Sequence, residues 1–274
     1  LPYTEKYKDQ QSLGQDVNKR TFEEAFNAVF HDKFKFAELC ALKLEDEIEK
    51  IEVDGRTIYR TSEKLKRFLR FIDKVVLRHL AKDDEVVHSF IKGKSTLTAV
   101  TAHASSKYFF LTDIENFYPN IKTENVRNIL LRDVSLVPIS DILDYVEIIV
   151  SMTTYGGSLP IGFATSPQLS NAFLFDFDRA VKKHCQERLL IYTRYADDII
   201  ISGMAFDDLS CLKDSIQNYL STCVSPNLNL KSSKTHITQT GNKVKILGLV
   251  VLPNGKITID IKYKKNIESL LHFY

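Results

Sequence analysis

The sequence predicts an α+β protein in which short apolar strands and amphipathic helices share one chain. Two stretches predict the strands: in Leu189–Ser202 two apolar, β-branched runs flank Asp197-Asp198, and Lys107–Asp113 is an apolar run that ends in an acid. Apolar residues at helical spacing predict the helices, and 62–80 gives the longest stripe. With 44% apolar and 26% charged residues, and no run of about 18 apolar residues, we expect a globular protein without a membrane span.

The first fifty residues predict a helical extension in which we see no chemistry. Residues 1–20 are polar, and Thr21–Glu24 fits a capping box at the start of one helix. A second helix is expected over 35–49. Because the chain starts with Leu1, we expect that the natural start is missing.

A hairpin is expected next, over Ile51–Tyr59, with Asp54-Gly55 as its turn. Arg56 and Arg60 lie on its second arm. Their forked guanidinium groups could bind a triphosphate, or they could keep an exposed strand soluble. The helix that follows, over 62–80, has four basic residues that are candidates for phosphate contact: Lys66, Arg70, Lys74 and Arg78.

The net charge of +2 conceals a strong segregation of charge. Residues 56–107 contain 12 Lys and Arg against 5 Asp and Glu, and residues 230–274 contain 8 against 2, so the rest of the chain is acidic. Two basic blocks around an acidic middle suit a polyanion groove around a metal site. The alternative is that both blocks are solvated helix faces.

The middle of the chain has one strong candidate for a functional residue, Asp113, and two weak candidates, a basic loop and His103. The basic loop Phe90–Ser95 lacks the spacing of a P-loop, and a structural role is favoured for His103. Asp113 ends a buried strand just before the aromatic pair Phe117-Tyr118, which is typical of a site, although an aspartate at a turn would look similar. Helices are expected over about 123–131 and 140–151.

A Gly- and Pro-rich loop precedes the next helix. In Gly156–Asn171, Ser166 is expected to be the N-cap and Pro167 to lie in the first turn of a helix that continues to Val181. Loop amides at a helix start suit an anionic or base-pairing ligand, but a plain junction would look the same.

The pair Asp197-Asp198 is expected at the tip of a hairpin with strands over 191–195 and 199–202. Adjacent carboxylates in a partly buried turn repel each other, and a divalent ion such as Mg²⁺ would offset this. The alternative is a solvated turn. After it we expect a helix around 209–220, a strand or loop with Lys231 and Lys234, a hairpin over 244–261 and a basic helix from 262.

Four stretches occur in one order: LTDIENFYPNI, LPIGFATSPQLSN, YTRYADDIIIS and NLNLKSSKTHI, followed by ILGLVV. Over about residues 50–265 this set resembles a reverse transcriptase, namely the bacterial retron and group II intron-like enzymes and the related defence-associated (DRT and Abi) group. YADD alone is a weak signal, whereas the ordered set is specific and argues against a solvated turn.

The resemblance implies a right-hand polymerase with an antiparallel palm sheet. It places the fingers at 51–107, the palm at 108–262 with a finger insertion at about 119–160, and the start of a thumb at 263–274, after the N-terminal extension 1–50. It implies two Mg²⁺ ions, for which Mn²⁺ could substitute, held by Asp113, Asp197 and Asp198 with Ile114 beside them.

The same resemblance implies further roles around the metals. Lys234 matches a lysine that protonates the leaving pyrophosphate, and Tyr118 matches an aromatic gate that selects deoxynucleotides. The expected nucleotide-binding residues are Arg56, Arg60, Tyr118, Ile161 and Gly162, and the expected primer grip is Leu247, Gly248 and Leu249. Many of these enzymes have Gln at the position of Ile161. An Ile at this position resembles the Abi and DRT group more than the retrons.

These observations predict an RNA-templated DNA polymerase of a bacterial retron or anti-phage defence system. The expected partners are a dedicated non-coding RNA, a DNA primer or product and dNTPs, and a homo-oligomer or accessory protein stays open. Two alternatives remain: template-independent or protein-primed DNA synthesis of the Abi type, and an RNA-binding scaffold with a vestigial site. Four cysteines without a CxxC pair fit a reducing, cytoplasmic location.

Overall fold

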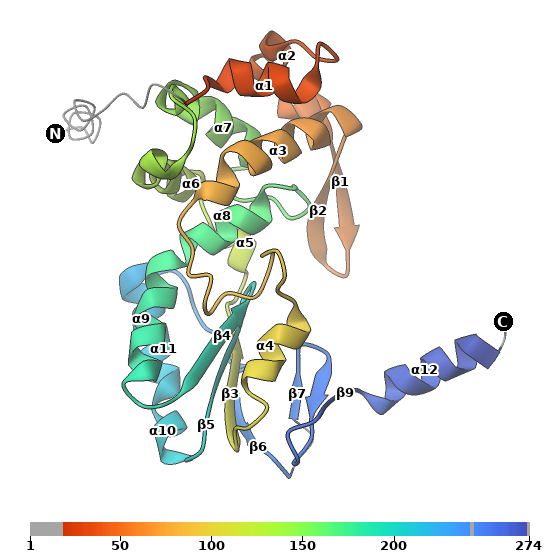
Figure 1. Cartoon of the computed structure of the whole chain (residues 1–274), viewed down its shortest axis with the longest axis vertical. Helices are drawn as coiled ribbons and strands as arrows, with labels where there is room; N and C mark the ends of the chain where they lie inside the picture. The colour runs from red at the N-terminus through yellow and green to blue at the C-terminus, as the bar shows by residue number, and fades with distance from the viewer. Residues whose placement is uncertain (1–18, 242–243, 273–274) are drawn as a thin grey trace. The chain divides into compact units, whose positions relative to one another are not determined.

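The computed structural model describes residues 19–241 and 244–272, which divide into two units (Figure 1). Unit 1 comprises the described residues up to Ala81 together with Lys122–Leu169, and unit 2 comprises Lys82–Ile121 and the described residues from Ser170 onward. The first part of the predicted N-terminal extension, residues 1–18, lies outside the described residues.

Unit 1 is built from helices around an aromatic core, with one antiparallel hairpin. Thr21 and Glu24 form the predicted capping box at the start of α1, and the rings of Phe22, Phe26 and Phe71 pack together in the core. The elements are α1 (Phe22–Phe30), α2 (Phe36–Cys40), β1 (Ile48–Val53), β2 (Arg56–Thr61), α3 (Glu63–Val75), α6 (Thr123–Arg132) and α7 (Val146–Thr153).

The prediction of one helix over residues 35–49 is wrong. Only α2 is helical there, a short 3₁₀ turn follows at Leu44–Asp46, and the chain then enters β1 at Ile48. β1 pairs with β2 along its whole length, from Ile48 opposite Thr61 to Val53 opposite Arg56. Strand pairing across the Asp54-Gly55 turn therefore overrides the helical pattern of an acidic segment.

Two further helix predictions need correction at their ends. α3 ends at Val75, and a 3₁₀ turn at Leu77–His79 replaces the last part of the helix predicted to reach residue 80. The helix predicted from Ser166 to Val181 is divided at Leu174 into α8 (Ser166–Phe173) and α9 (Phe175–Gln186). Ser166 is the first residue of α8, and its hydroxyl donates to the carbonyl of Pro160 at 2.6 Å.

Unit 2 contains a four-stranded antiparallel sheet in the order β4-β5-β3-β6. β3 lies in the middle and pairs with β5 on one side and β6 on the other. The predicted strands of the Asp-Asp hairpin are β4 and β5. The bounds are β3 (Tyr108–Asp113), β4 (Ile191–Tyr195), β5 (Asp198–Gly203) and β6 (His236–Gln239).

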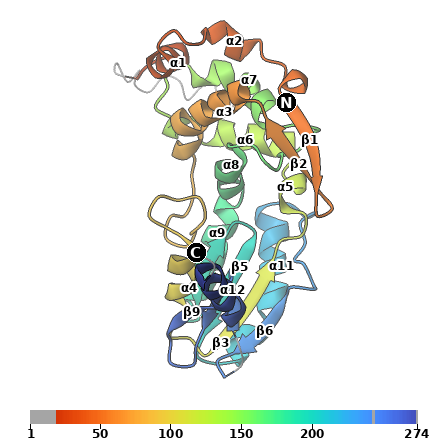
Figure 2. The ribbon, with the colours of Figure 1, turned by 90° about the vertical axis from the view of Figure 1, so that its right-hand side faces the viewer.

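Helices cover one face of this sheet, and α4 (Thr96–Ala102) with a second sheet covers the other (Figures 1 and 2). α9 and α11 (Leu212–Cys223) pack together on the first face, where α9 contacts β4, while α4 contacts β4 and β8 (Leu249–Val251) on the second face. The remaining helices of unit 2 are α4 (Thr96–Ala102), α5 (Phe117–Asn120), α10 (Asp207–Ser210), α11 (Leu212–Cys223) and α12 (Ile261–His272).

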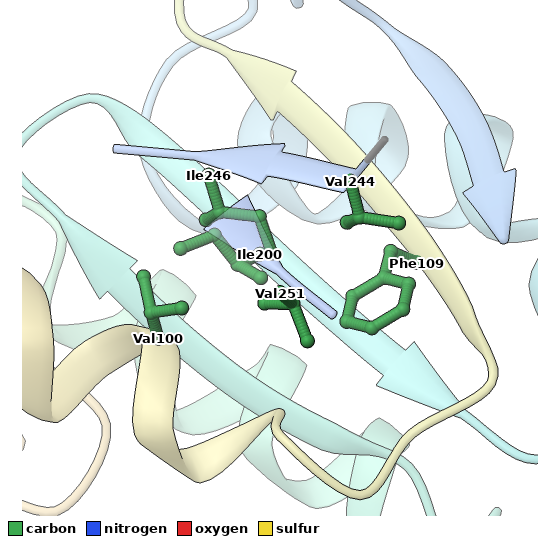
Figure 3. Packing of buried hydrophobic residues seen from close by; sticks show 6 residues of the cluster. All are labelled: Val100, Phe109, Ile200, Val244, Ile246 and Val251. Carbon is green, nitrogen blue, oxygen red and sulfur yellow. The ribbon is translucent and has the colours of Figure 1, made fainter. Parts of the chain in front are cut away.

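The second sheet has three strands where the sequence predicts a two-stranded hairpin. β7 (Val244–Ile246) pairs with β8 (Leu249–Val251), and β8 pairs with β9 (Ile257–Ile259). The additional turn is Leu247-Gly248, whose residues have φ of 50° and 83°, the backbone of a two-residue hairpin turn. A shared apolar core joins this sheet to the four-stranded one (Figure 3): Val100, Phe109, Ile200, Val244, Ile246 and Val251.

α12 leaves β9 and extends away from the three-stranded sheet (Figure 1). Among the described helices, none combines the length and the apolar character that crossing a bilayer requires.

Candidate active site

The turn between β4 and β5 places two carboxylates at one end of the four-stranded sheet. Ala196 and Asp197 form the turn, and Asp198 is the first residue of β5, one residue earlier than expected from the sequence. Ala196 has a φ of 54°, in the left-handed region that residues other than glycine seldom adopt.

A third carboxylate comes from the neighbouring strand. β3 ends at Asp113, whose Cα partner across the β3–β5 ladder is Asp198. Residues that lie directly opposite in an antiparallel pair point to the same face, so these two side chains share one face of the sheet. The amide of Ile114 also donates to the carbonyl of Asp197 at 3.2 Å. The structure therefore brings Asp113, Ile114, Asp197 and Asp198 together.

This cluster holds more negative charge than its protein surroundings neutralise. Asp113 is 4% exposed; its Oδ2 accepts from Lys234 Nζ at 2.7 Å, and its buried Oδ1 has no hydrogen-bond partner within residues 19–241 and 244–272. Burial, followed by the hydrogen bond with Asp113 and the charge of Asp113, raises the pKa of Asp197 to about 7. Burial and then the charge of Asp113 raise the pKa of Asp198, which Lys234 partly opposes.

The donor set fits a divalent cation. Hard carboxylate oxygens suit Mg²⁺, and a cation would satisfy the buried Oδ1 of Asp113 and relieve the repulsion that raises the neighbouring pKa values. In the described part of the chain, no three His, Cys, Asp or Glu side chains are already arranged to hold an ion. Lys234 forms an ion pair with Asp113 in the same cluster.

A cavity of about 260 Å³ opens beside the cluster, on the face that carries β7 and β8. Asp198, Lys234, Lys245 and Leu247 are among the residues that line it. Leu247 belongs to the predicted primer grip, and Gly248 and Leu249 continue the same turn into β8. The structure therefore places the predicted primer-grip turn beside the cavity that Asp198 lines.

Tyr118 lies on the short helix α5, directly after the strand that carries Asp113. Its ring is partly buried against Phe117 at 5.6 Å between centroids, and its hydroxyl is hydrogen-bonded to Ser170. Burial raises the pKa of the Tyr118 hydroxyl.

Four predicted nucleotide-binding residues belong to unit 1. Arg56 and Arg60 lie on β2 with exposed side chains, and Arg60 forms a 3.4 Å ion pair with Glu49. The loop before α8 docks on β2, where the amide of Tyr59 donates to the carbonyl of Ile161 at 2.8 Å. Gly162 has a φ of 108°, and a Cβ there would lie 2.3 Å from the carbonyl oxygen of Tyr59, so only glycine fits.

The sequence did not reveal the buried polar network beneath the Asp-Asp turn. Arg194 is fully buried and forms a two-pronged ion pair with Asp178 of α9, with 2.8 and 2.6 Å between nitrogen and oxygen. Ser89 and Asn171 complete the network. One signal could have indicated it: an arginine at an inward-facing strand position needs a buried acid. His103 directly follows α4 and is hydrogen-bonded to Ser202 of β5 and Thr193 of β4, a structural role as the sequence favoured.

Comparisons with known proteins agree with this geometry. The family model described as reverse transcriptase (RNA-dependent DNA polymerase) matches residues 48–251. The retron Ec86 reverse transcriptase of Escherichia coli is 28% identical over 221 residues, which cover 79% of this chain and 64% of that protein. The retron Mx162 reverse transcriptase of Myxococcus xanthus is 24% identical over 231 residues, covering 76% of this chain and 47% of that protein. The chain thus spans less than two thirds of either relative.

The solved structures add a likeness of fold. A truncated apo telomerase from Candida tropicalis matches with a TM-score of 0.51 at 15% identity, covering 78% of this chain and 54% of that one. Together with the family match, this confirms the predicted α+β, right-hand polymerase fold with an antiparallel sheet.

Proposed function

Because the chain belongs to the reverse transcriptase (RNA-dependent DNA polymerase) family, we propose that it synthesises DNA from dNTPs on an RNA template. The curated relatives at 24–28% identity are retron reverse transcriptases, which supports a retron or a related anti-phage defence system as its setting. Its partners would be a dedicated non-coding RNA and a DNA primer or product, in the bacterial cytoplasm.

The observation that carries this proposal is the cluster of Asp113, Asp197 and Asp198 on one end of a single sheet. These carboxylates, with the main chain of Ile114, would hold two Mg²⁺ ions, or Mn²⁺ in their place. When bound, such ions stabilise the charge that develops as the primer 3′-oxygen attacks the α-phosphate and pyrophosphate leaves.

Residues around the cluster have complementary proposed roles. Lys234, whose Nζ lies 2.7 Å from Asp113 Oδ2, would give its proton to the leaving pyrophosphate. The ring of Tyr118 would fill the space of a ribose 2′-hydroxyl. In unit 1, Arg56 and Arg60 would bind the triphosphate, with Ile161 and Gly162 close to the sugar and base. Leu247, Gly248 and Leu249 would hold the primer end.

The domain boundaries remain those that the resemblance implies. We propose fingers at 51–107, a palm at 108–262 with an insertion at about 119–160, and the start of a thumb at 263–274, after the extension 1–50.

Primer extension on an RNA template tests the proposal. Purified protein with Mg²⁺ should extend an annealed DNA primer, and Asp197→Ala should abolish extension. Asp214→Ala, which removes an exposed aspartate of α11, is the matched control and should extend like the parent. Extension by Asp197→Ala at the parent rate would contradict the assignment of the site.

A further inference from the structure

The peptide groups on both sides of Ala196 are held by hydrogen bonds from inside unit 2. The amide of Ala196 donates to Ser89 Oγ at 2.8 Å, and its carbonyl accepts from Arg194 Nη1 at 2.8 Å. Ala196 is the residue with a φ of 54°, and it directly precedes Asp197. The direction in which the two carboxylates leave the turn therefore depends on a backbone conformation that alanine disfavours by itself.

The groups that hold Ala196 are themselves fixed. Ser89, Asn171 and Arg194 are all 0% exposed. Asn171 Nδ2 donates to the carbonyl of Ser89 at 3.0 Å, and Asn171 Oδ1 accepts from Arg194 Nη1 at 3.2 Å. Ser89 from a loop, Asn171 from α8 and Arg194 from β4 thus form one hydrogen-bonded network around the turn.

The ion pair between Arg194 and Asp178 anchors this network to α9. Asp178 accepts from Arg194 Nε and Nη2, and Tyr192 donates its hydroxyl to Asp178 Oδ1 at 2.7 Å. A buried ion pair is weak support for stability, because the desolvation of both charges offsets their attraction. Its geometric effect is clearer: it leaves the guanidinium one orientation, in which Nη1 faces the carbonyl of Ala196.

We propose that Ser89, Asn171 and Arg194 are positioning residues that hold Ala196 in its left-handed conformation, so that Asp197 and Asp198 can bind a divalent cation. We call these three residues the Ala196 clamp. The proposal rests on the proposed metal-binding role of the carboxylates. It assigns to the clamp the part that outer hydrogen bonds play around metal ligands in general.

Direct metal binding tests the clamp. Mn²⁺ is titrated into the protein, and the free ion is followed by electron paramagnetic resonance, so that no DNA synthesis is needed. Ser89→Ala removes the acceptor for the Ala196 amide and should raise the dissociation constant for Mn²⁺ by about tenfold. Ser106→Ala is the matched control, because Ser106 is also a buried serine, and its hydroxyl is hydrogen-bonded to that of Ser202 in β5 at 2.7 Å. It should bind Mn²⁺ like the parent.

A second variant separates positioning from loss of packing. Glycine adopts positive φ without strain, so Ala196→Gly in the Ser89→Ala background should recover most of the lost Mn²⁺ affinity. A purely structural role of Ser89 predicts no such recovery, since Ala196→Gly adds no contact. Urea unfolding of each variant shows that folded protein is being compared.

The outcomes distinguish the clamp from the proposed function. Parent-like Mn²⁺ binding by folded Ser89→Ala would overturn the clamp, as would the absence of any recovery with Ala196→Gly. A parent that binds no Mn²⁺ would overturn it too, because no metal site would exist to position. A parent that binds Mn²⁺ but makes no DNA would defeat the proposed function and leave the clamp supported by its own variants.

Discussion

Asp197 has an environment unlike that of an ordinary aspartate in a turn. Burial, followed by the hydrogen bond with Asp113 and the charge of Asp113, raises the pKa of Asp197 to about 7. An exposed turn aspartate would be ionised. The buried Oδ1 of Asp113, which has no hydrogen-bond partner among the described residues, points the same way: the cluster suits a positive charge beyond the one that Lys234 supplies.

Tyr118 gives a prediction about sugar selection. Its ring is held by Phe117 and by the hydrogen bond to Ser170, so removing it should open space without moving the carboxylates. Tyr118→Ala should lower the preference for dNTPs over NTPs by about tenfold or more. Competitive incorporation of dNTPs and NTPs measures this ratio. Tyr118→Phe keeps the ring and should keep the preference; equal preferences in the parent and Tyr118→Ala would exclude the gate.

His103 gives a prediction about acid stability. Burial, and to a lesser extent the charge of His88, lowers the pKa of His103 to about 3, whereas a histidine in the unfolded chain has a pKa of about 6.5. The unfolded state therefore binds the proton more readily. The stability that neutral His103 contributes is present above pH 6.5 and is lost as the pH falls toward 3. Between pH 7 and pH 5 this amounts to about 2 kcal/mol.

Urea unfolding at the two pH values measures this loss. His103→Gln retains groups that can hydrogen-bond Ser202 and Thr193 but does not titrate, so it should lose about 2 kcal/mol less than the parent between pH 7 and pH 5. The exposed His236 serves as the control, and His236→Gln should follow the parent. Equal losses of stability in the parent and in His103→Gln would show that His103 does not cause the loss at low pH.

At the scale of elements, α3 carries a row of basic side chains along one exposed side. Arg70 and Lys74 are exposed and one helical turn apart, and Lys66 has an ion pair with Glu63; Arg78, which pairs with Asp73, lies beyond α3 in the 3₁₀ turn Leu77–His79. Such a row suits the phosphates of a nucleic-acid backbone.

We predict that Arg70→Gln with Lys74→Gln weakens RNA binding and lowers its dependence on salt. If each residue contacts one phosphate, the slope of log K against log salt should fall by about 0.7–0.9 per residue. Filter binding over a range of salt concentrations gives this slope. Lys33→Gln with Lys43→Gln removes the same charge from exposed positions elsewhere in unit 1 and should leave the slope unchanged; a fall of equal size there would show a general charge effect.

The elements differ in how far the sequence predicts them. Asp54-Gly55 marks its turn because both residues adopt positive φ, and this turn lies where predicted. The turn at Leu247-Gly248 was missed because leucine gives no such signal, although it has a φ of 50°. The prediction of a helix over 35–49 failed at its end because the chain there enters β1, which pairs with β2. β2 lies outside the stretch of sequence from which the helix was predicted.

The same limit applies to the site. The positions of Asp113 and Asp197-Asp198 at strand ends follow from local apolar runs, and their register follows once β3 and β5 pair. The Ala196 clamp joins residues that lie 82 and 107 positions apart, so no local pattern contains it. Its one local trace is Arg194, an arginine within an apolar strand.

For the whole molecule, charge and family point to one substrate class. A basic block at 56–107, a second at 230–274 and an acidic remainder suit a polyanion bound around metal-holding carboxylates. The family match over residues 48–251 includes the carboxylates and the strands that position them. We therefore propose that this chain copies an RNA sequence into DNA.

Sequencing the DNA product tests this claim most directly. Purified protein freed of RNA is given dNTPs, Mg²⁺ and one of two RNA templates with different sequences, each with the same annealed primer. We predict that each product is the complement of the RNA supplied, that no product forms without RNA, and that Asp197→Ala makes none. DNA made without RNA, or products that ignore the change of template, would contradict the claim and favour template-independent or protein-primed synthesis.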